Sequence, residues 1–196
     1  AELHMRHRDF DSAFSYYEKA IKKNEQNIHA HIGLQEAARR AGKDVTERYQ
    51  HAWESEPTDP TAAYLFARLL RPDKALKQLD KVRTTTFYVH LERARAHAAL
   101  DGKDEGVEIS LAEARLPKDS PRAMDLLAGY YEDKKQYTKA LPLFDAALKI
   151  APDRVEALVG RGNVLRLLGE YEDAIKALSR ALELDEDDPE IPYRIG

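Results

Sequence analysis

Residues 121–154 read PRAMDLLAGYYEDKKQYTKALPLFDAALKIAPDR, and residues 155–188 read VEALVGRGNVLRLLGEYEDAIKALSRALELDEDD. When the second segment is written beneath the first, small and bulky apolar side chains coincide at an offset of 34 residues. The coinciding pairs are Met124 and Leu158, Ala128 and Gly162, Ala140 and Ala174, Phe144 and Leu178, and Ala147 and Ala181. A fixed period of this size is typical of stacked helical repeats.

Each 34-residue segment contains two apolar stripes with helical spacing. In the first segment Leu127, Ala128 and Tyr131 are spaced as i, i+1 and i+4, and Ala140 and Phe144 begin a second stripe. A short polar stretch separates the two stripes, which predicts two helices joined by a turn. Helices of about 14 residues are marginal alone in water, so each pair must pack against the next pair to bury its stripes.

The rest of the chain continues this pattern with weaker matches. The predicted units are residues 1–27 (the tail of a first helix and then the second half), 28–59, 60–86, 87–120 and 189–196 (start of a first helix only). The second stripe consists of Val45, Tyr49 and Ala52 in the unit 28–59, and of Val107, Leu111 and Ala114 in the unit 87–120. In the unit 60–86 the first helix is about one turn short, because Pro72 comes early and is suited to begin the next helix.

Composition excludes several classes of function. The 196 residues are 34% charged and 43% hydrophobic, with a mean hydropathy of −0.64, and no apolar run approaches the ~18 residues of a membrane span. The chain has no cysteine, which excludes disulfides, cysteine-ligated metals and thiol catalysis. Its net charge of −4 argues against general nucleic-acid binding. The sequence does not determine the cellular compartment, and we slightly favour the cytoplasm over the periplasm.

The order of large, small and aromatic positions in residues 121–188 resembles the tetratricopeptide repeat (TPR), and most of the chain follows it in divergent form. The resemblance implies an all-α fold, a right-handed superhelical solenoid of antiparallel helix pairs. We expect one solenoid over residues 1–196, with about five full repeats and partial repeats at both ends. Both ends of the chain lie within a first helix, which suggests a fragment of a larger protein with exposed terminal helices.

In the TPR family the first helices line a concave groove, and fixed positions of each unit face a bound partner. The resemblance therefore implies a partner-binding face made of residues from four units. Its candidate residues are Ile32, Glu36 and Arg39, then Glu92, then Arg122, Asp125 and Glu132, and finally Glu156, Val159, Asn163 and Arg166. An amide side chain such as that of Asn163 can bond to a peptide backbone.

The sequence gives little support to a C-terminal carboxylate clamp, a metal site or a catalytic site. No unit carries the Lys–Asn pair with which some TPR proteins bind a C-terminal carboxylate. The histidines, at 4/7, 29/31 and 90/97 among other positions, lack the spacing of a zinc motif, so we expect no metal site and surface or interface histidines. Nucleophile elbows, phosphate-binding loops and paired catalytic carboxylates are also missing, so we expect neither an enzyme nor a cofactor.

The sequence thus favours a non-catalytic scaffold that binds a peptide or helix of a partner protein in the concave groove. One alternative is a self-assembly module, a homo-oligomer formed through the repeat ends or the convex face. Another is a regulatory repeat region of an enzyme whose catalytic domain lies outside this chain. We expect neither nucleic-acid binding nor membrane insertion, and the sequence does not identify the partner protein.

Overall fold

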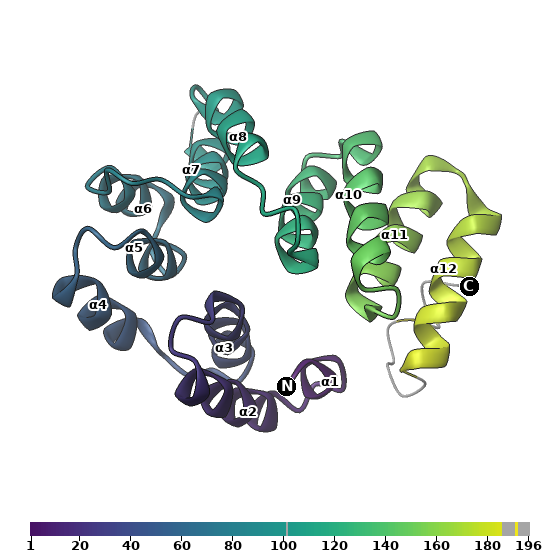
Figure 1. Ribbon diagram of the computed structural model, residues 1–196, viewed down its shortest axis with the longest axis horizontal. Helices are drawn as coiled ribbons and strands as arrows, with labels where there is room; N and C mark the ends of the chain where they lie inside the picture. The colour runs from purple at the N-terminus through teal and green to yellow at the C-terminus, as the bar shows by residue number, and fades with distance from the viewer. Residues whose placement is uncertain (101, 186–190, 192–196) are drawn as a thin grey trace. The chain divides into compact units, whose positions relative to one another are not determined.

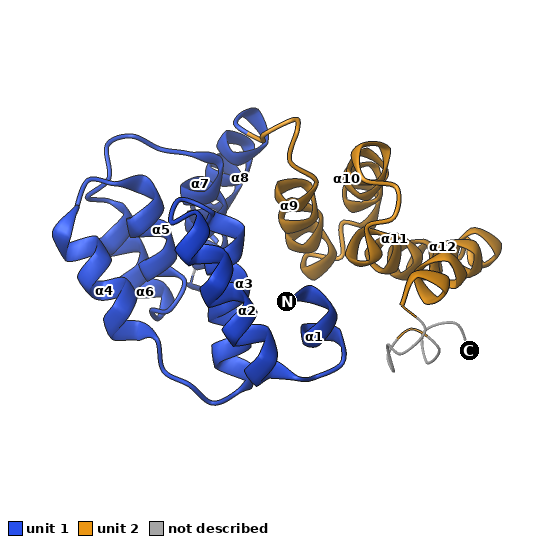
Figure 2. Cartoon of the chain, turned by 60° about the horizontal axis from the view of Figure 1, so that its bottom comes forward, with its two compact units in different colours: residues 1–115 blue, residues 116–196 orange. Residues whose placement is uncertain are grey.

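The computed structural model describes residues 1–100, 102–185 and 191, and every regular element in this part of the chain is an α-helix. The helices are α1 (Glu2–Arg6), α2 (Phe10–Lys23), α3 (Ile28–Arg40), α4 (Thr46–Ser55), α5 (Pro60–Ala67), α6 (Pro72–Leu79), α7 (Phe87–Leu100), α8 (Glu105–Ala114), α9 (Pro121–Asp133), α10 (Tyr137–Ile150), α11 (Val155–Leu168) and α12 (Tyr171–Leu184) (Figure 1). They belong to two compact units, residues 1–115 with α1–α8 and residues 116–196 with α9–α12 (Figure 2). A single solenoid over residues 1–196 stays a prediction.

Local sequence explains where several helices begin. The Ser120 hydroxyl accepts a hydrogen bond from the backbone N–H of Ala123 (3.2 Å), and Pro121 occupies the first position of α9. The Asp59 carboxylate accepts one from Ala62 (2.7 Å) before Pro60 begins α5. A hydroxyl or carboxylate followed by proline satisfies the free N–H groups of a first turn and starts a helix at a defined residue.

In the unit of residues 116–196 the helices pack in chain order, α9 on α10, α10 on α11 and α11 on α12, and α9 also contacts α11 (Figure 1). The predicted stripes are buried here: Leu127, Ala128 and Tyr131 in α9, and Ala140 and Phe144 in α10. The helix pairs and their apolar faces were therefore predictable in this unit.

Gly162 shows why small residues recur at one position of the repeat. A Cβ atom built on Gly162 of α11 would lie 2.6 Å from Cγ of Leu178 and 3.2 Å from the carbonyl oxygen of Ala174, both in α12. Carbon atoms in proteins do not pack that closely, so any side chain here would push α12 away from α11. The absent side chain therefore sets the distance between the two helices.

A second glycine position joins consecutive repeats. A Cβ atom on Gly160 would lie 2.4 Å from Cζ of Phe144, so the ring from α10 occupies the space beside the glycine of α11. The same arrangement recurs near the N-terminus, where the ring of Tyr17 in α2 lies against Gly33 in α3. Both aromatic rings are buried.

The unit of residues 1–115 departs from the regular repeat at α5 and α6, which have only eight residues each. Helix α5 is nevertheless the most enclosed helix of this unit, with a continuous buried run from Ala63 to Ala67 and contacts to α3, α4, α6 and α7. A helix that is apolar on all sides is stable only when other elements cover it completely. The short first helix expected before Pro72 is observed.

Helices α3 and α4 do not form the tight pair that the sequence pattern suggests. Helix α3 packs against α2 and α5, and α4 packs against α5. The Tyr49 hydroxyl still reaches back to His31, with 3.1 Å between the oxygen and Nδ1. Ala52, which the pattern placed in a buried stripe, is exposed. At the position that Ala128 and Gly162 hold in later repeats, α3 carries the large side chain of Gln35.

In α8 the buried face is rotated relative to the predicted one. Val107, assigned to the apolar stripe, is 62% exposed and Ala114 is also exposed, whereas Ile109 and Ala112 are buried. The inward-facing set includes Glu108, whose side chain is 15% exposed and pairs with His90 of α7. A carboxylate thus faces inward where the sequence pattern predicted valine.

We expect Gly162→Ala to lower the free energy of unfolding by about 1–3 kcal/mol, because the added methyl group overpacks the α11–α12 contact. Gly129→Ala is the matched control: it lies in α9, and its Cβ would meet no atom within 4 Å. That variant should gain about 0.5–1 kcal/mol from the better helix propensity of alanine. Urea denaturation followed by circular dichroism measures both, and equal changes in the two variants would contradict the packing explanation.

Candidate partner-binding site

The predicted partner-binding residues of the unit 116–196 come from α9 and α11, the first helices of two consecutive repeats. Arg122, Asp125 and Glu132 belong to α9, and the other four, Glu156, Val159, Asn163 and Arg166, belong to α11. Because α9 and α11 contact each other directly, residues far apart in sequence meet on one surface. We call this surface the α9–α11 face.

Three of the predicted residues form a continuous polar bridge across this face. The Asn163 side-chain Nδ2 donates a hydrogen bond to Oε1 of Glu132, which joins α11 to α9. Arg166 Nη2 donates to Oδ1 of Asn163 over 3.0 Å. Glu132 and Asn163 are half-buried and Arg166 is exposed, so the bridge reaches the surface at its arginine. These contacts restrict the rotamers of all three side chains before any partner binds.

A second link lies at the other end of the face. Arg154, the residue before α11, donates from Nε to Oδ2 of Asp125 over 2.5 Å, and its Nη1 lies 3.6 Å from Oε2 of Glu156. Burial raises the pKa of the Asp125 carboxyl, although Arg154 acts in the opposite direction. The second oxygen of Asp125, Oδ1, is buried without a hydrogen-bond partner among the described residues. This ion pair fixes the start of α11 against α9.

Between the two links the face is open. Gly129 lies one turn after Asp125 and one turn before Glu132 in α9, so the three residues share one side of the helix. A Cβ atom on Gly129 would meet no atom within 4 Å. The backbone of α9 is thus accessible at a point flanked by polar side chains that are already positioned.

The remaining predicted residues have more structural roles. Val159 is half-buried and packs against the core cluster around Leu158 and Leu178. Ile32 in α3 is likewise half-buried against the core of its own unit. In that unit Glu36 binds Arg39 on the same helix, with 2.5 Å between Oε1 and Nη2.

The pKa of Glu36 reflects these contacts. Burial alone would raise it, but hydrogen bonds from Arg39 and Arg40 outweigh burial and lower the pKa of the carboxyl below its usual value. Glu92 in α7 lies 3.8 Å from Arg95 in the same helix. The structure therefore gives the predicted residues of α3 and α7 partners within their own helices, whereas those of α9 and α11 are joined across two repeats.

Sequence reasoning missed three residues of interest. Arg154 lies in a turn outside the positions that the repeat pattern assigns to a partner, although it anchors Asp125. Gln35 and Arg68 occupy the position held by Ala128 and Gly162 in later repeats, and they are hydrogen-bonded to each other. The sequence did contain a signal for this pair, because two large polar residues, 33 residues apart, occupy a position where later repeats have a small residue.

Comparison with known proteins places this architecture in a family. The sequence profile of the tetratricopeptide repeat matches residues 119–187, which include α9 to α12. Residues 119–187 are therefore a tetratricopeptide repeat segment. A comparison with curated protein sequences finds no match.

Three solved structures illustrate the TPR fold of this chain. MamA is 21% identical, with a TM-score of 0.57 over 69% of this chain and 76% of MamA. YrrB, described as a TPR protein with an unusual peptide-binding site, is 16% identical, with a TM-score of 0.56 over 90% of this chain and 96% of YrrB. A chain of the APC/C hetero-tetramer Cut9–Hcn1 is 16% identical, with a TM-score of 0.60 over 98% of this chain and 40% of that chain. At these identities the likeness concerns the fold.

TPR folds are protein–protein interaction scaffolds, and the family is generally non-catalytic. Within the described residues of this chain, no helix is long and apolar enough to cross a membrane. The same residues contain no group of three or more histidine, aspartate or glutamate side chains arranged to hold a metal ion.

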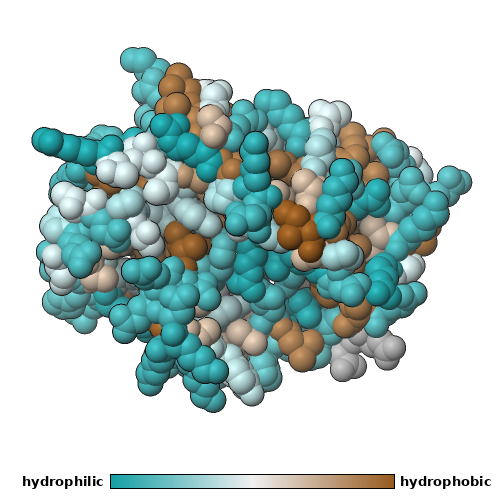
Figure 3. Space-filling model, viewed as in Figure 1, coloured by the Kyte–Doolittle hydropathy of each residue, from teal (hydrophilic) through white to brown (hydrophobic). Residues whose placement is uncertain are grey.

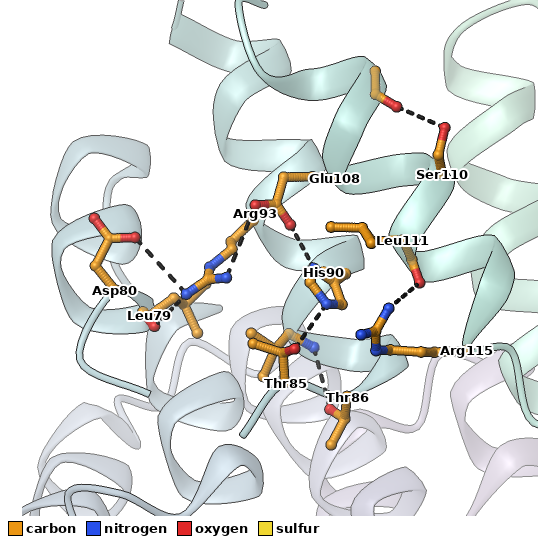
Figure 4. Close-up of polar contacts among 12 residues, drawn as sticks. Leu79, Asp80, Thr85, Thr86, His90, Arg93, Glu108, Ser110, Leu111 and Arg115 are labelled. Atoms are coloured by element: carbon orange, nitrogen blue, oxygen red, sulfur yellow. Dashed lines mark hydrogen bonds and ion pairs between the residues drawn. The ribbon is translucent and has the colours of Figure 1, made fainter. Parts of the chain in front are cut away.

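One histidine of the chain is deeply buried, contrary to the expectation of surface or interface histidines. His90 in α7 is 3% exposed, and its Nδ1 lies 2.6 Å from Oε2 of Glu108 in α8 (Figure 4). Its Nε2 lies 2.9 Å from the Thr85 hydroxyl in the segment before α7. Arg93, also in α7, extends its Nη1 toward Glu108 (3.8 Å) and donates from Nη2 to the carbonyl oxygen of Leu79 (2.7 Å).

These contacts join α6, the threonine segment, α7 and α8 through Glu108 and its two partners, His90 and Arg93 (Figure 4). We expect Glu108→Gln to lower the free energy of unfolding by about 2 kcal/mol, since the neutral amide replaces the buried carboxylate beside His90 and leaves Arg93 only the exposed Asp80 as a counter-charge. Glu56→Gln, an exposed change outside the network, should stay within about 0.5 kcal/mol of the wild type. Urea denaturation tests both, and an unaffected Glu108 variant would show that the network does not stabilise the unit.

His31 gives the chain a pH-dependent contribution to stability. Its Nε2 donates to the Glu25 carbonyl oxygen (2.8 Å), and burial lowers the pKa of its imidazole below the ordinary 6.5. As the pH falls below 6.5, the unfolded chain takes up the proton before the folded chain does, so stability is lost. We expect the unfolding free energy to fall more steeply between pH 7.5 and 5.5 in the wild type than in His31→Gln. Parallel pH profiles would contradict this.

Proposed function

We propose that this chain is a non-catalytic scaffold that binds an extended segment of a partner protein along the α9–α11 face. The observation that carries the proposal is the open backbone at Gly129 beside the Glu132–Asn163–Arg166 bridge. Binding to pre-positioned side chains loses less conformational entropy than binding to mobile ones. A segment lying across Gly129 can approach the backbone of α9 closely while its own polar groups meet the bridge.

The polar groups of the face suit a peptide that carries both acidic and basic side chains. Glu132 and Glu156 offer carboxylate acceptors, and Arg166 offers guanidinium donors at the exposed end of the bridge. Asn163 already uses one amide hydrogen and its oxygen within the chain, so it positions Glu132 and Arg166 and has one hydrogen left for a ligand. This changes the role expected for Asn163 from a direct clamp to an organiser of its neighbours.

The proposal is tested by filling the open position. Gly129→Leu places a bulky side chain on the face, and we expect it to weaken peptide binding by at least about tenfold because the segment can no longer approach α9. Dodecapeptides are selected from a random phage library on the wild-type chain, and their affinities are measured by fluorescence anisotropy. Asn163→Ala combined with Arg166→Ala should also weaken binding, since the bridge is lost.

Gly106→Leu is the matched control, because Gly106 is an exposed helical glycine of α8 with no atom within 4 Å of its Cβ position. It makes the same substitution in the other unit and should leave the affinity unchanged. If peptides selected on the wild type bind Gly129→Leu as tightly as Gly106→Leu, the α9–α11 face is not the binding surface and the proposal is wrong.

Self-association is the second candidate function, and α12 is the feature that favours it. Tyr171 and Ile175, one turn apart on α12, are 63% and 47% exposed. On the face seen in Figure 3, apolar side chains occupy patches among hydrophilic ones. Light scattering across concentration distinguishes the candidates: a dimer that Ile175→Lys returns to a monomer supports assembly, whereas a monomer at all concentrations favours peptide binding over assembly.

A further inference from the structure

A cleft of about 430 Å³ opens in the unit of residues 1–115, where the C-terminal parts of α3 and α5 meet the turn before α4. Its walls include six polar or charged side chains, Gln35, Glu36, Arg39, Lys43, Asp44 and Arg68. The cleft exists because α4 packs against α5 and leaves the end of α3 uncovered. None of the residues of the α9–α11 face takes part in it.

Two of these side chains stand where other repeats have a small residue. Gln35 is 3% exposed, and its Nε2 donates a hydrogen bond to the carbonyl oxygen of Leu65 near the end of α5 (2.6 Å). Its Oε1 accepts one from Nε of Arg68 over 2.9 Å. At Gly162 there is no room for even a methyl group, whereas here two long polar side chains fill the space between neighbouring repeats. The polar pair therefore replaces close helix packing.

The Arg68 guanidinium has neutral hydrogen-bond partners, and the carboxylates of Glu92 and Glu36 act on it only from beyond ion-pair distance. Besides Gln35, it donates from Nη1 to the Tyr64 hydroxyl over 3.1 Å, and burial raises the pKa of that phenol, so Tyr64 is uncharged. No carboxylate among the described residues lies within ion-pair distance of Arg68. Guanidinium has five N–H donors, and Gln35 and Tyr64 use two of them. Glu92 and Glu36 favour the charged form of Arg68 from a distance, and a carboxylate bound in direct contact would add the close ion pair that it lacks.

The other charges of the cleft are already paired. Arg39 binds Glu36, and Lys43 binds Asp11 with 2.7 Å between Nζ and Oδ1. Asp44 accepts a hydrogen bond from the backbone N–H of Thr46 at the start of α4 (2.8 Å). Arg68 is thus the one basic side chain of the cleft that has no carboxylate within ion-pair distance among the described residues. A ligand with a single negative charge would supply this contact.

We propose that this cleft binds a side-chain carboxylate, a glutamate or aspartate of a partner protein, through Arg68. A planar carboxylate matches two parallel N–H groups of a guanidinium, which is the strongest neutralising contact that one arginine can make. A dianionic phosphate fits less well, because Glu36 and Asp44 lie in the same wall. A side chain suits the geometry because Arg68 lies beside buried Tyr64 and Gln35, so the carboxylate must extend inward from a chain on the rim.

The test uses the full chain labelled with ¹⁵N and three short peptides as probes. Acetyl-Ala-Ala-Glu-Ala-Ala-amide carries the carboxylate, the same peptide with Gln is its neutral match, and acetyl-Ala-Ala-Ala with a free C-terminus carries a chain-end carboxylate. The backbone amide of Gly42, which lines the cleft, reports binding through its chemical shift. We expect the Glu peptide to bind at least about tenfold more tightly than the Gln peptide.

Two variants assign the effect to Arg68. Arg68→Met removes the charge but keeps an apolar chain of similar length, and it should abolish the preference for Glu over Gln. Because Gln35 and Tyr64 each lose a hydrogen-bond donor in this variant, its thermal midpoint is measured in parallel to verify that the chain is folded at the temperature of the titration. Arg71→Met is the control: the residue is highly exposed, pairs with Asp73 outside the cleft, and loses the same charge. This control should keep the preference.

Three results would overturn the proposal. They are an equal response to the Glu and Gln peptides, a preference that survives in Arg68→Met, and a larger response to inorganic phosphate or to the free C-terminus than to the Glu peptide. Because the cleft and the α9–α11 face lie in different units and share no residue, failure of one leaves the other standing.

Discussion

The structure depends on how closely the two helices of a repeat approach each other. In the repeat of α11 and α12, Gly162 brings Leu178 and the carbonyl of Ala174 to within van der Waals distance of its own backbone. Close packing of this kind lets helices too short to be stable alone bury their apolar stripes. The α9–α11 face follows from it, because regular packing behind the first helices keeps α9 and α11 side by side.

Where this constraint is relaxed, polar side chains replace close packing. In the unit of residues 1–115, Gln35 and Arg68 occupy the small-residue position, α4 separates from α3, and a cleft appears. Around α7 and α8, Glu108 turns inward and meets His90 and Arg93. Buried polar groups demand specific partners, so they fix the rotation of a helix more narrowly than apolar contacts do. The two units thus solve the same packing problem in different ways.

This contrast explains which parts of the molecule could be predicted from the sequence. Residues 121–188 repeat small, bulky and aromatic positions in the same order, and their buried stripes were predictable because every member is apolar. In α8 the apolar pattern predicted that Val107 would be buried, but Glu108 faces inward instead. The sequence alone does not show that the partners of Glu108 are His90 and Arg93. Likewise, the apolar pattern of Val45, Tyr49 and Ala52 does not reveal that α4 packs on α5, which leaves Ala52 exposed.

The same limit applies to the candidate site. The residues of α9 and α11 were predictable because the repeat fixes their positions along each helix. Their hydrogen bonds were not, since the bond between Glu132 and Asn163 depends on the distance between two repeats, and Arg154 lies in a turn outside the repeat pattern.

The aromatic–glycine contacts described above also have an evolutionary consequence. The ring of Phe144 requires a glycine at position 160 in the following repeat, and Tyr17 requires Gly33 in the same way. Each repeat therefore restricts which repeat can follow it, so the units are not interchangeable, and duplication or recombination of single repeats would preserve the fold only when ring and glycine are inherited together.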